Sequence, residues 1–236
     1  MRMTREKTVV QLTYLPNVFP VNCYLVEEED GITLVDAALP NNVKAILQAA
    51  EQLGKPINRI VLTHAHEDHI GSLDGLKERL PAAQVFISKR DAKLLEGDRS
   101  LEEGEPSAPI RGGVPKKVRT KPDVLLQDGD RVGSLLAVAA PGHTPGSMAF
   151  LDTRNDILIV GDAFQTRAGV AVSGQLKLLF PFPAMATWDK RTSLETARRL
   201  RDLKPSLLAA GHGNMVLQPQ QLIEKAIQAA ERSLAK

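Results

Sequence analysis

The stretch that decides the fold is Thr63-His64-Ala65-His66-Glu67-Asp68-His69, which holds four residues of metal-binding type within six positions. The residues before it, 59–62, are predicted to form a buried strand. The residues after it, 70–80, carry leucines at a spacing that predicts a helix. The stretch therefore lies at the junction of a strand and a helix.

Two histidines of this stretch are expected to point to one side of the chain. Side chains alternate along an extended backbone, so His64 and His66 share a face. Asp68 and His69 fall where the chain turns into the helix, from where they can face back toward that spot. Imidazole and carboxylate ligands together suit zinc, and also iron, manganese or nickel. The motif therefore predicts a site for metal ions at the end of a strand.

Three more residues of metal-binding type occupy similar places, each in a loop directly after a predicted strand. His143 lies in PGHTPGS, His212 in GHG and Asp162 in GDA. The neighbouring glycines let the backbone approach a site closely. Each residue alone would also suit a turn or a cap. Because all 5 histidines of the chain share this placement, we interpret the whole set as one composite metal site.

The order of HAHEDH, GHTPGS, GDA and GHG resembles the metallo-β-lactamase superfamily of metal-dependent hydrolases. The resemblance extends over residues 36–212. It implies an α/β (α+β) fold, a four-layer αββα sandwich, with the metals at one edge between the two sheets. No internal linker resembles a domain boundary, so residues 1–236 are expected to form a single domain.

The resemblance also implies which residues hold two divalent ions, expected to be zinc with iron or manganese as alternatives. Asp162 would bridge the two ions. Asp36 would orient a ligand histidine from behind, although a plain cap or turn role is the alternative. The remaining ligands divide into two sets, one for each ion: His64, His66 and His143, and Asp68, His69 and His212.

The expected chemistry is hydrolysis of a small ester, thioester or lactone. Two ions can share a water molecule and lower its pKa, which gives hydroxide at neutral pH. Asp68 is the candidate catalytic residue that orients this hydroxide and passes its proton to the leaving group. Glu67 is expected to point to solvent. A small-molecule substrate follows from this interpretation.

Departures from known subfamilies leave the substrate open. True β-lactamases generally carry Cys or Ser where this chain has Asp162, and related lactonases place a Tyr where it has Gln165. Glyoxalase II enzymes carry a helical extension for which the chain leaves little room. An iron-dependent sulfur (persulfide) dioxygenase and a phosphodiester hydrolase are the alternatives. The only support for a phosphodiester hydrolase is a short basic run: Lys116, Lys117, Arg119 and Lys121.

Two segments are expected to surround the site. The apolar run after residue 177 is predicted to line a substrate pocket, or else to pack as a plain loop; its candidate residues are Phe180, Phe182, Met185 and Trp188. Residues 97–122 are rich in Gly and Pro and predict a long excursion that cannot bury much surface. We interpret this segment as a lid over the metals or as a solvated loop far from them.

Composition excludes several other classes. The formal net charge of +2 is too small for the dense basic stripe of a nucleic-acid-binding protein. No stretch is apolar enough to span a membrane. The single cysteine, Cys23, gives no sign of an oxidising compartment, so a soluble cytoplasmic protein is expected. The oligomeric state is not predicted.

Overall fold

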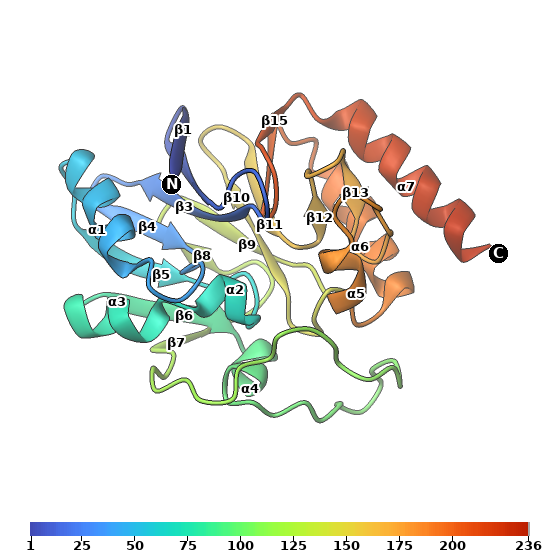
Figure 1. Cartoon of the computed structure of the whole chain (residues 1–236), viewed down its shortest axis with the longest axis horizontal. Coiled ribbons are helices and arrows are strands. Elements are labelled where there is room, and N and C mark those ends of the chain that lie inside the picture. Colours follow the sequence, from blue (N-terminus) through green and yellow to red (C-terminus); the bar gives the residue numbers. More distant parts are fainter. Residues whose placement is uncertain (236) are drawn as a thin grey trace.

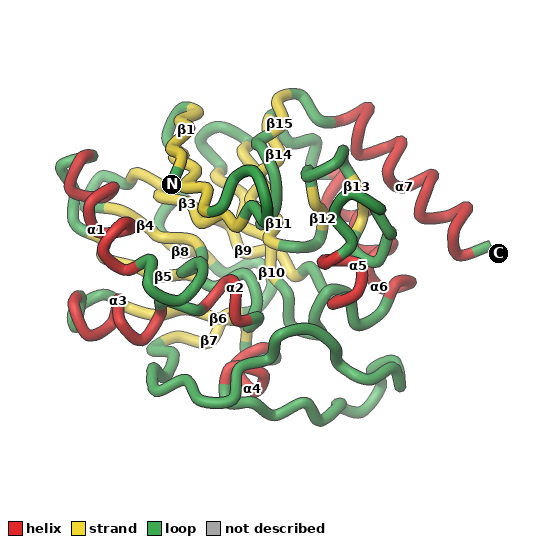
Figure 2. The backbone as a smooth tube through the Cα atoms, viewed as in Figure 1, coloured by secondary structure: helices red, strands yellow, loops and turns green. Residues whose placement is uncertain are grey.

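Two β-sheets lie face to face between two layers of helices in the computed structural model, which describes residues 1–235 (Figure 1). This is the four-layer αββα arrangement that the family resemblance implies. Figure 2 shows the strands in the middle of the molecule and the helices on its outer sides. Within the described residues, no helix is both long and apolar enough to cross a bilayer.

The first sheet has seven strands, whose spatial order follows their order in the chain. The first four are antiparallel neighbours, and the last four run parallel to one another. Parallel neighbours need crossover connections, which here carry helices. The strands are β1 (Arg2–Glu6), β2 (Val9–Tyr14), β3 (Val21–Glu27), β4 (Ile32–Val35), β5 (Ile57–Val61), β6 (Gln84–Ser88) and β7 (Val124–Leu126), and the helices α1 (Val43–Gln52), α2 (Glu67–Ile70), α3 (Leu73–Arg79) and α4 (Asp91–Leu95).

The second sheet has six strands in the order β15-β14-β11-β10-β9-β8, and a two-stranded ribbon, β12-β13, lies apart from it. Only β11 and β14 are parallel neighbours in this sheet. Its elements are β8 (Arg131–Val132), β9 (Leu135–Ala139), β10 (Met148–Asp152), β11 (Ile157–Gly161), β12 (Phe164–Gln165), β13 (Ala171–Val172), α5 (Phe182–Ala186), α6 (Lys190–Asp202), β14 (Leu207–Ala210), β15 (Val216–Leu217) and α7 (Gln220–Leu234).

Three apolar clusters hold the layers together, and strand β11 shows how. Its residues alternate between two faces, as the two-residue period of a strand requires. Leu158 and Val160 pack with the helices α6 and α7. Ile157 and Ile159 pack between the two sheets. A third cluster joins the first sheet to α1 and α3.

The elements that the sequence does not predict are short or half exposed. Strands β12, β13 and β15 have two residues each, too few for a hydrophobic period. Strand β1 is an edge strand with no buried residue. The helix predicted over 70–80 is instead two helices, α2 and α3, which Gly71 and Ser72 separate. Residues 97–122 hold no helix or strand, as the sequence predicts.

Candidate metal centre and pocket

The topology brings four loops together at one edge of the sandwich. Strands β4 and β5 are parallel neighbours in one sheet, and β11 and β14 are parallel neighbours in the other. The loops that follow these strands carry Asp36, the 64–69 motif, Asp162 and His212. His143 joins them from the loop between β9 and β10.

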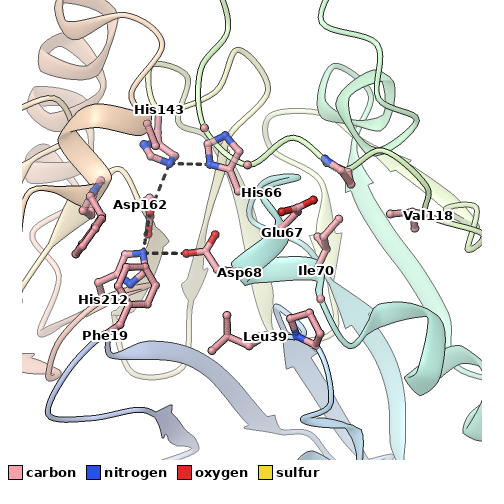
Figure 3. A pocket seen from close by; sticks show the side chains of 18 of the residues that line it. Phe19, Leu39, His66, Glu67, Asp68, Ile70, Val118, His143, Asp162 and His212 are labelled. Atoms are coloured by element: carbon pink, nitrogen blue, oxygen red, sulfur yellow. Dashed lines mark hydrogen bonds and ion pairs between the residues drawn. The ribbon is translucent and has the colours of Figure 1, made fainter.

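All seven predicted ligands meet there. Three sets of three residues each offer ligand atoms within 4.8 Å of one another. Asp162 lies between His143 and His212, with its Oδ2 atom 3.4 Å from His143 Nε2 and 3.2 Å from His212 Nε2 (Figure 3). The sets are His64, His66 and His143; His64, His69 and Asp162; and Asp68, His69 and His212.

The atoms that face the centre are of the kind that bind metal ions. His64 Nε2, His69 Nε2 and Asp162 Oδ1 are buried and have no hydrogen-bond partner among the described residues. His66 Nδ1 and His143 Nε2 lie only 3.0 Å apart. Buried polar atoms almost always have partners. These clusters are therefore consistent with a binuclear metal site with nitrogen and oxygen ligands.

Each histidine is held from behind by its other ring nitrogen. The partner is a backbone carbonyl, a carboxylate or a hydroxyl oxygen, and when it accepts the outer ring proton, the inward nitrogen of a neutral ring is left with a free lone pair. The outer contacts are His64 Nδ1 to Thr63 Oγ1 at 3.0 Å, His66 Nε2 to Arg111 O at 3.0 Å, His69 Nδ1 to Asp36 Oδ2 at 2.8 Å, His143 Nδ1 to Ser173 Oγ at 3.0 Å and His212 Nδ1 to Pro20 O at 2.7 Å.

Asp36 positions two of these rings. It accepts the proton of His69 directly, and it also accepts a hydrogen bond of 2.8 Å from the Thr63 hydroxyl. Since that hydroxyl donates to Asp36, its oxygen is free to accept from His64 Nδ1. Asp36 has a positive φ of 63°, a strained conformation that clusters at functional sites. The contact to His69 is the one expected of an orienting residue.

Asp91 joins two of the ligand loops, and no sequence pattern points to it. This buried residue begins the short helix α4. Its Oδ2 accepts from the Ala65 amide at 3.0 Å and from the Thr144 hydroxyl at 2.8 Å, and its Oδ1 accepts from the Gly146 amide at 2.8 Å. Ala65 lies between two ligands, and Thr144 follows a third. Burial raises the pKa of Asp91 to about 6.

Charge divides the centre into two halves. Burial lowers the pKa of His64 well below its ordinary value and that of His143 to about 3. Burial acts in the same direction on His69 and His212, but the nearby carboxylates, Asp162 foremost, outweigh it. They raise the pKa of His69 well above its ordinary value and that of His212 to about 10. One half thus holds neutral imidazoles, and the other holds imidazolium–carboxylate pairs.

The centre opens into a cavity of about 760 Å³, a size that suits a small molecule (Figure 3). Ligand residues line one side of it. Glu67, expected to point to solvent, is exposed and also lies on the cavity wall. The other walls are largely apolar, and their larger side chains are Phe19, Leu39, Ile70, Val118, Phe182 and Met185.

Two of the four predicted pocket residues, Phe182 and Met185, lie on this wall. The other two are not among its lining residues, and each packs elsewhere. The buried ring of Phe180 packs on His212, with ring centroids 5.3 Å apart. Trp188 is buried, and its Nε1 donates to the carbonyl of Ala108 at 2.8 Å. An apolar run does not show by itself which of its side chains face inward.

The segment 97–122 lies against the metal centre, not far from it. Most of its residues are exposed, as the sequence predicts, but Ile110 and Val114 are buried in the core. The Gly113 carbonyl accepts from the Glu67 amide at 2.8 Å. Gly112 has a φ of 85°, and a Cβ at this position would collide with the ring of His66. The segment is therefore part of the wall over the ligands.

Comparison with known proteins agrees with this geometry. The family model described as "Metallo-beta-lactamase superfamily" matches residues 16–212. "Uncharacterized protein YobT" of Bacillus subtilis (strain 168) is 58% identical over 98% of this chain and 100% of its own length. "Probable metallo-hydrolase YflN" of the same organism is 28% identical over 81% of this chain and 80% of its own length. The structure described as "Crystal structure of TTHA1623 in a di-iron-bound form" matches with a TM-score of 0.65 and 27% identity, over 89% of this chain and 96% of that chain.

Proposed function

The chain belongs to the metallo-beta-lactamase superfamily, and we propose that it is a metal-dependent hydrolase that cleaves an ester, thioester or lactone bond in a small molecule. One observation carries the proposal: five inward ring nitrogens and two carboxylates converge beneath a largely apolar cavity. Polar groups that converge at one side of an apolar pocket are typical of an active site.

Two divalent ions in this centre would supply an activated water molecule and polarise the acyl carbonyl. The residues of the chain then have distinct tasks. Asp162 would hold the two ligand sets at a fixed separation. Asp68 faces the cavity with a partly exposed side chain, 3.4 Å from His212 Nε2. Burial opposes its ionisation, but His69 and His212 keep its pKa below the ordinary value, so Asp68 is ready to accept a proton and to orient the water.

We propose zinc as the native metal, with iron or manganese as alternatives. Imidazole-rich sets with a few carboxylates suit all three metals. The di-iron form of the TTHA1623 structure supports iron as an alternative, since that protein shares the fold at 27% identity.

The test is a substrate panel on protein of known metal content. Esters, thioesters, lactones and phosphodiesters of matched size are assayed with the zinc-, iron- and manganese-loaded enzyme, and with the Asp68→Asn variant. Hydrolysis of an acyl substrate that needs the metal and falls at least about 100-fold in Asp68→Asn supports the proposal. An enzyme that cleaves only the phosphodiester, or nothing in the panel, refutes it.

One observation favours the second candidate, an iron-dependent sulfur dioxygenase. His64, His69 and Asp162 form a set of two histidines and one carboxylate, which is the set that non-haem iron oxygenases use. An oxygen electrode separates the two functions. Oxygen uptake by the iron-loaded enzyme with glutathione persulfide, without hydrolysis of any acyl substrate, would favour the dioxygenase.

The remaining expectations belong to this proposal. The partner is a small-molecule substrate, not a nucleic acid, because the cavity is small and the net charge is only +2. A cytoplasmic location is proposed from the single cysteine.

A further inference from the structure

The basic run in the wall segment divides into paired and unpaired residues. Arg119 and Lys121 are tied to acids: Arg119 Nη2 lies 2.5 Å from Glu78, and Lys121 Nζ lies 2.6 Å from Glu96. Lys116 and Lys117, both exposed, form no ion pair with any residue that the structure describes. The run is therefore not a uniform solvated stretch.

The two unpaired lysines are the two that line the cavity. Lys116 and Lys117 are the only lysine or arginine side chains among the described residues of its wall. The paired residues, Arg119 and Lys121, do not line it. Two cations without acid partners thus face the space that the substrate would occupy.

These lysines belong to a stretch of the cavity wall whose last residue is Val118. The next residue, Val118, is at the opposite end of the cavity from His143 and Asp162 (Figure 3). Glu67 and Ile70 lie between the two ends in the same view. A molecule that spans the cavity would place one end at the metals and the other near the lysines.

Most acids around the cavity are engaged elsewhere. Asp74 accepts from the Thr120 hydroxyl at 2.7 Å and pairs with Arg119. Asp68 and Asp162 face the histidines of the centre. Glu67 is the remaining acid of the wall, and it forms no ion pair with either lysine in the part of the chain that the structure describes. The lysines therefore keep their charge available for a ligand.

We propose that Lys116 and Lys117 form a subsite for a carboxylate or phosphate group of the substrate, separated from the scissile acyl carbon by a short apolar spacer. This inference rests on the proposed hydrolase function for the position of the reacting end. It names the substrate class as an anionic ester, thioester or lactone. Lysine suits such a group because its ammonium is a point charge with three rotatable donors.

Equilibrium binding of product-like acids tests the subsite without turnover. The metal-loaded protein is titrated calorimetrically with pentanoate, pentanedioate and 5-phosphonopentanoate, each of which offers the metals one carboxylate. The anionic second group should tighten binding about tenfold relative to pentanoate, because it adds two modest ion pairs. The preference should shrink as salt is raised. The better of the two doubly anionic probes identifies the group as carboxylate or phosphate.

Two variants make the test specific. Lys116→Ala/Lys117→Ala should remove the preference and leave pentanoate binding unchanged. Lys121→Ala is the control, because Lys121 belongs to the same segment but does not line the cavity. This variant should keep the preference for the doubly anionic acids. Equal binding of all three acids to the parent, or an unchanged preference in the double variant, overturns the subsite.

Kinetics separate the failure of the subsite from the failure of the function. Two thioesters are compared that differ only in a terminal carboxylate or its uncharged carboxamide. The double variant should raise KM about tenfold for the anionic thioester alone, with kcat unchanged. Hydrolysis of both thioesters with equal KM in parent and variant overturns the subsite and keeps the function. A binding preference without any hydrolysis keeps the subsite and overturns the function.

Discussion

The Nε2 nitrogen of His66 lies 3.0 Å from the carbonyl oxygen of Arg111. His66 belongs to the ligand motif, and Arg111 belongs to the long segment 97–122. Because a carbonyl can only accept, the ring proton sits on Nε2, and Nδ1 faces His143 across 3.0 Å. The wall segment thus helps to set the tautomer of the ligand His66. The position of the segment and the metal affinity are therefore coupled.

Gly112→Ala tests this coupling. A Cβ at Gly112 would collide with the His66 ring, so the backbone of the segment must shift and the contact to Arg111 is lost. Affinity for one of two ions should fall about 10–100-fold, as for other changes behind a ligand. Competition titration with a chromophoric chelator measures it.

Gly104→Ala is the matched control, because Gly104 has the same φ of 85° but nothing within 4 Å of an added Cβ. It bears the same backbone strain without the collision. An equal loss of metal affinity in the two variants would show that the backbone strain, and not the collision with His66, causes the loss.

Asp162→Ala tests the pairing of the two ligand sets. The parent protein, purified without chelator, is expected to approach two metal equivalents. The variant should lose the paired arrangement, with metal affinity or activity lowered at least about 10–100-fold. Elemental analysis measures the metal content, and far-ultraviolet circular dichroism checks that the fold persists. A parent that saturates at one equivalent, or a fully active variant, contradicts the bridging role.

Much of the site follows from local sequence. The alternation of a strand places His64 and His66 on one side, and both bring ligand nitrogens into one set with His143. His143, Asp162 and His212 are recognisable because each follows a strand in a glycine-flanked loop. Gly211 shows the reason for such glycines, since a Cβ there would collide with Asp162 and His69.

The residues that support the ligands are much harder to predict. Arg111 contributes only a carbonyl oxygen, and any residue type has one. Phe19 comes from the β2–β3 turn and meets Phe182 with ring centroids 4.9 Å apart, across a long stretch of sequence. Asp91 stands at the start of a short helix, a place where an acidic residue is also common without any role at a site. These contacts depend on how the two sheets pack, which no local pattern encodes.

Asp91→Asn tests the link between the two ligand loops. The amide offers only one oxygen where three donors need acceptors, so at least one buried donor is left unpaired. We expect a loss of stability of about 1–3 kcal/mol together with weaker binding of one metal ion. Chemical denaturation and metal titration measure the two effects.

Asp98→Asn is the control for the Asp91 variant, because Asp98 is exposed just beyond the same helix and accepts from the Ser100 amide. It should leave metal affinity unchanged. If Asp91→Asn loses stability but binds both ions like the parent, Asp91 supports the fold and does not position the ligands.

The two halves of the centre should differ in the protons that they release when metal binds. The pKa of His143 is about 3, so this histidine and its neighbour His64 bind an ion at pH 7 without losing a proton. The pKa of His212 is about 10 and that of His69 is also raised, so both are protonated at pH 7 in the metal-free protein. An ion that binds them must displace these protons.

Titration of chelator-treated protein at pH 7, in buffers of different ionisation enthalpy, should therefore show two distinct steps. The tighter step should release almost no proton and vary little between pH 6 and 8. The weaker step should release about two protons, one from each raised histidine, and its affinity should rise with pH. Asp36→Asn should reduce the proton release of the weaker step alone, because Asp36 Oδ2 is the carboxylate that holds the outer nitrogen of His69. Equal proton release in both steps would mean that the charges of the two halves are not separated in this way.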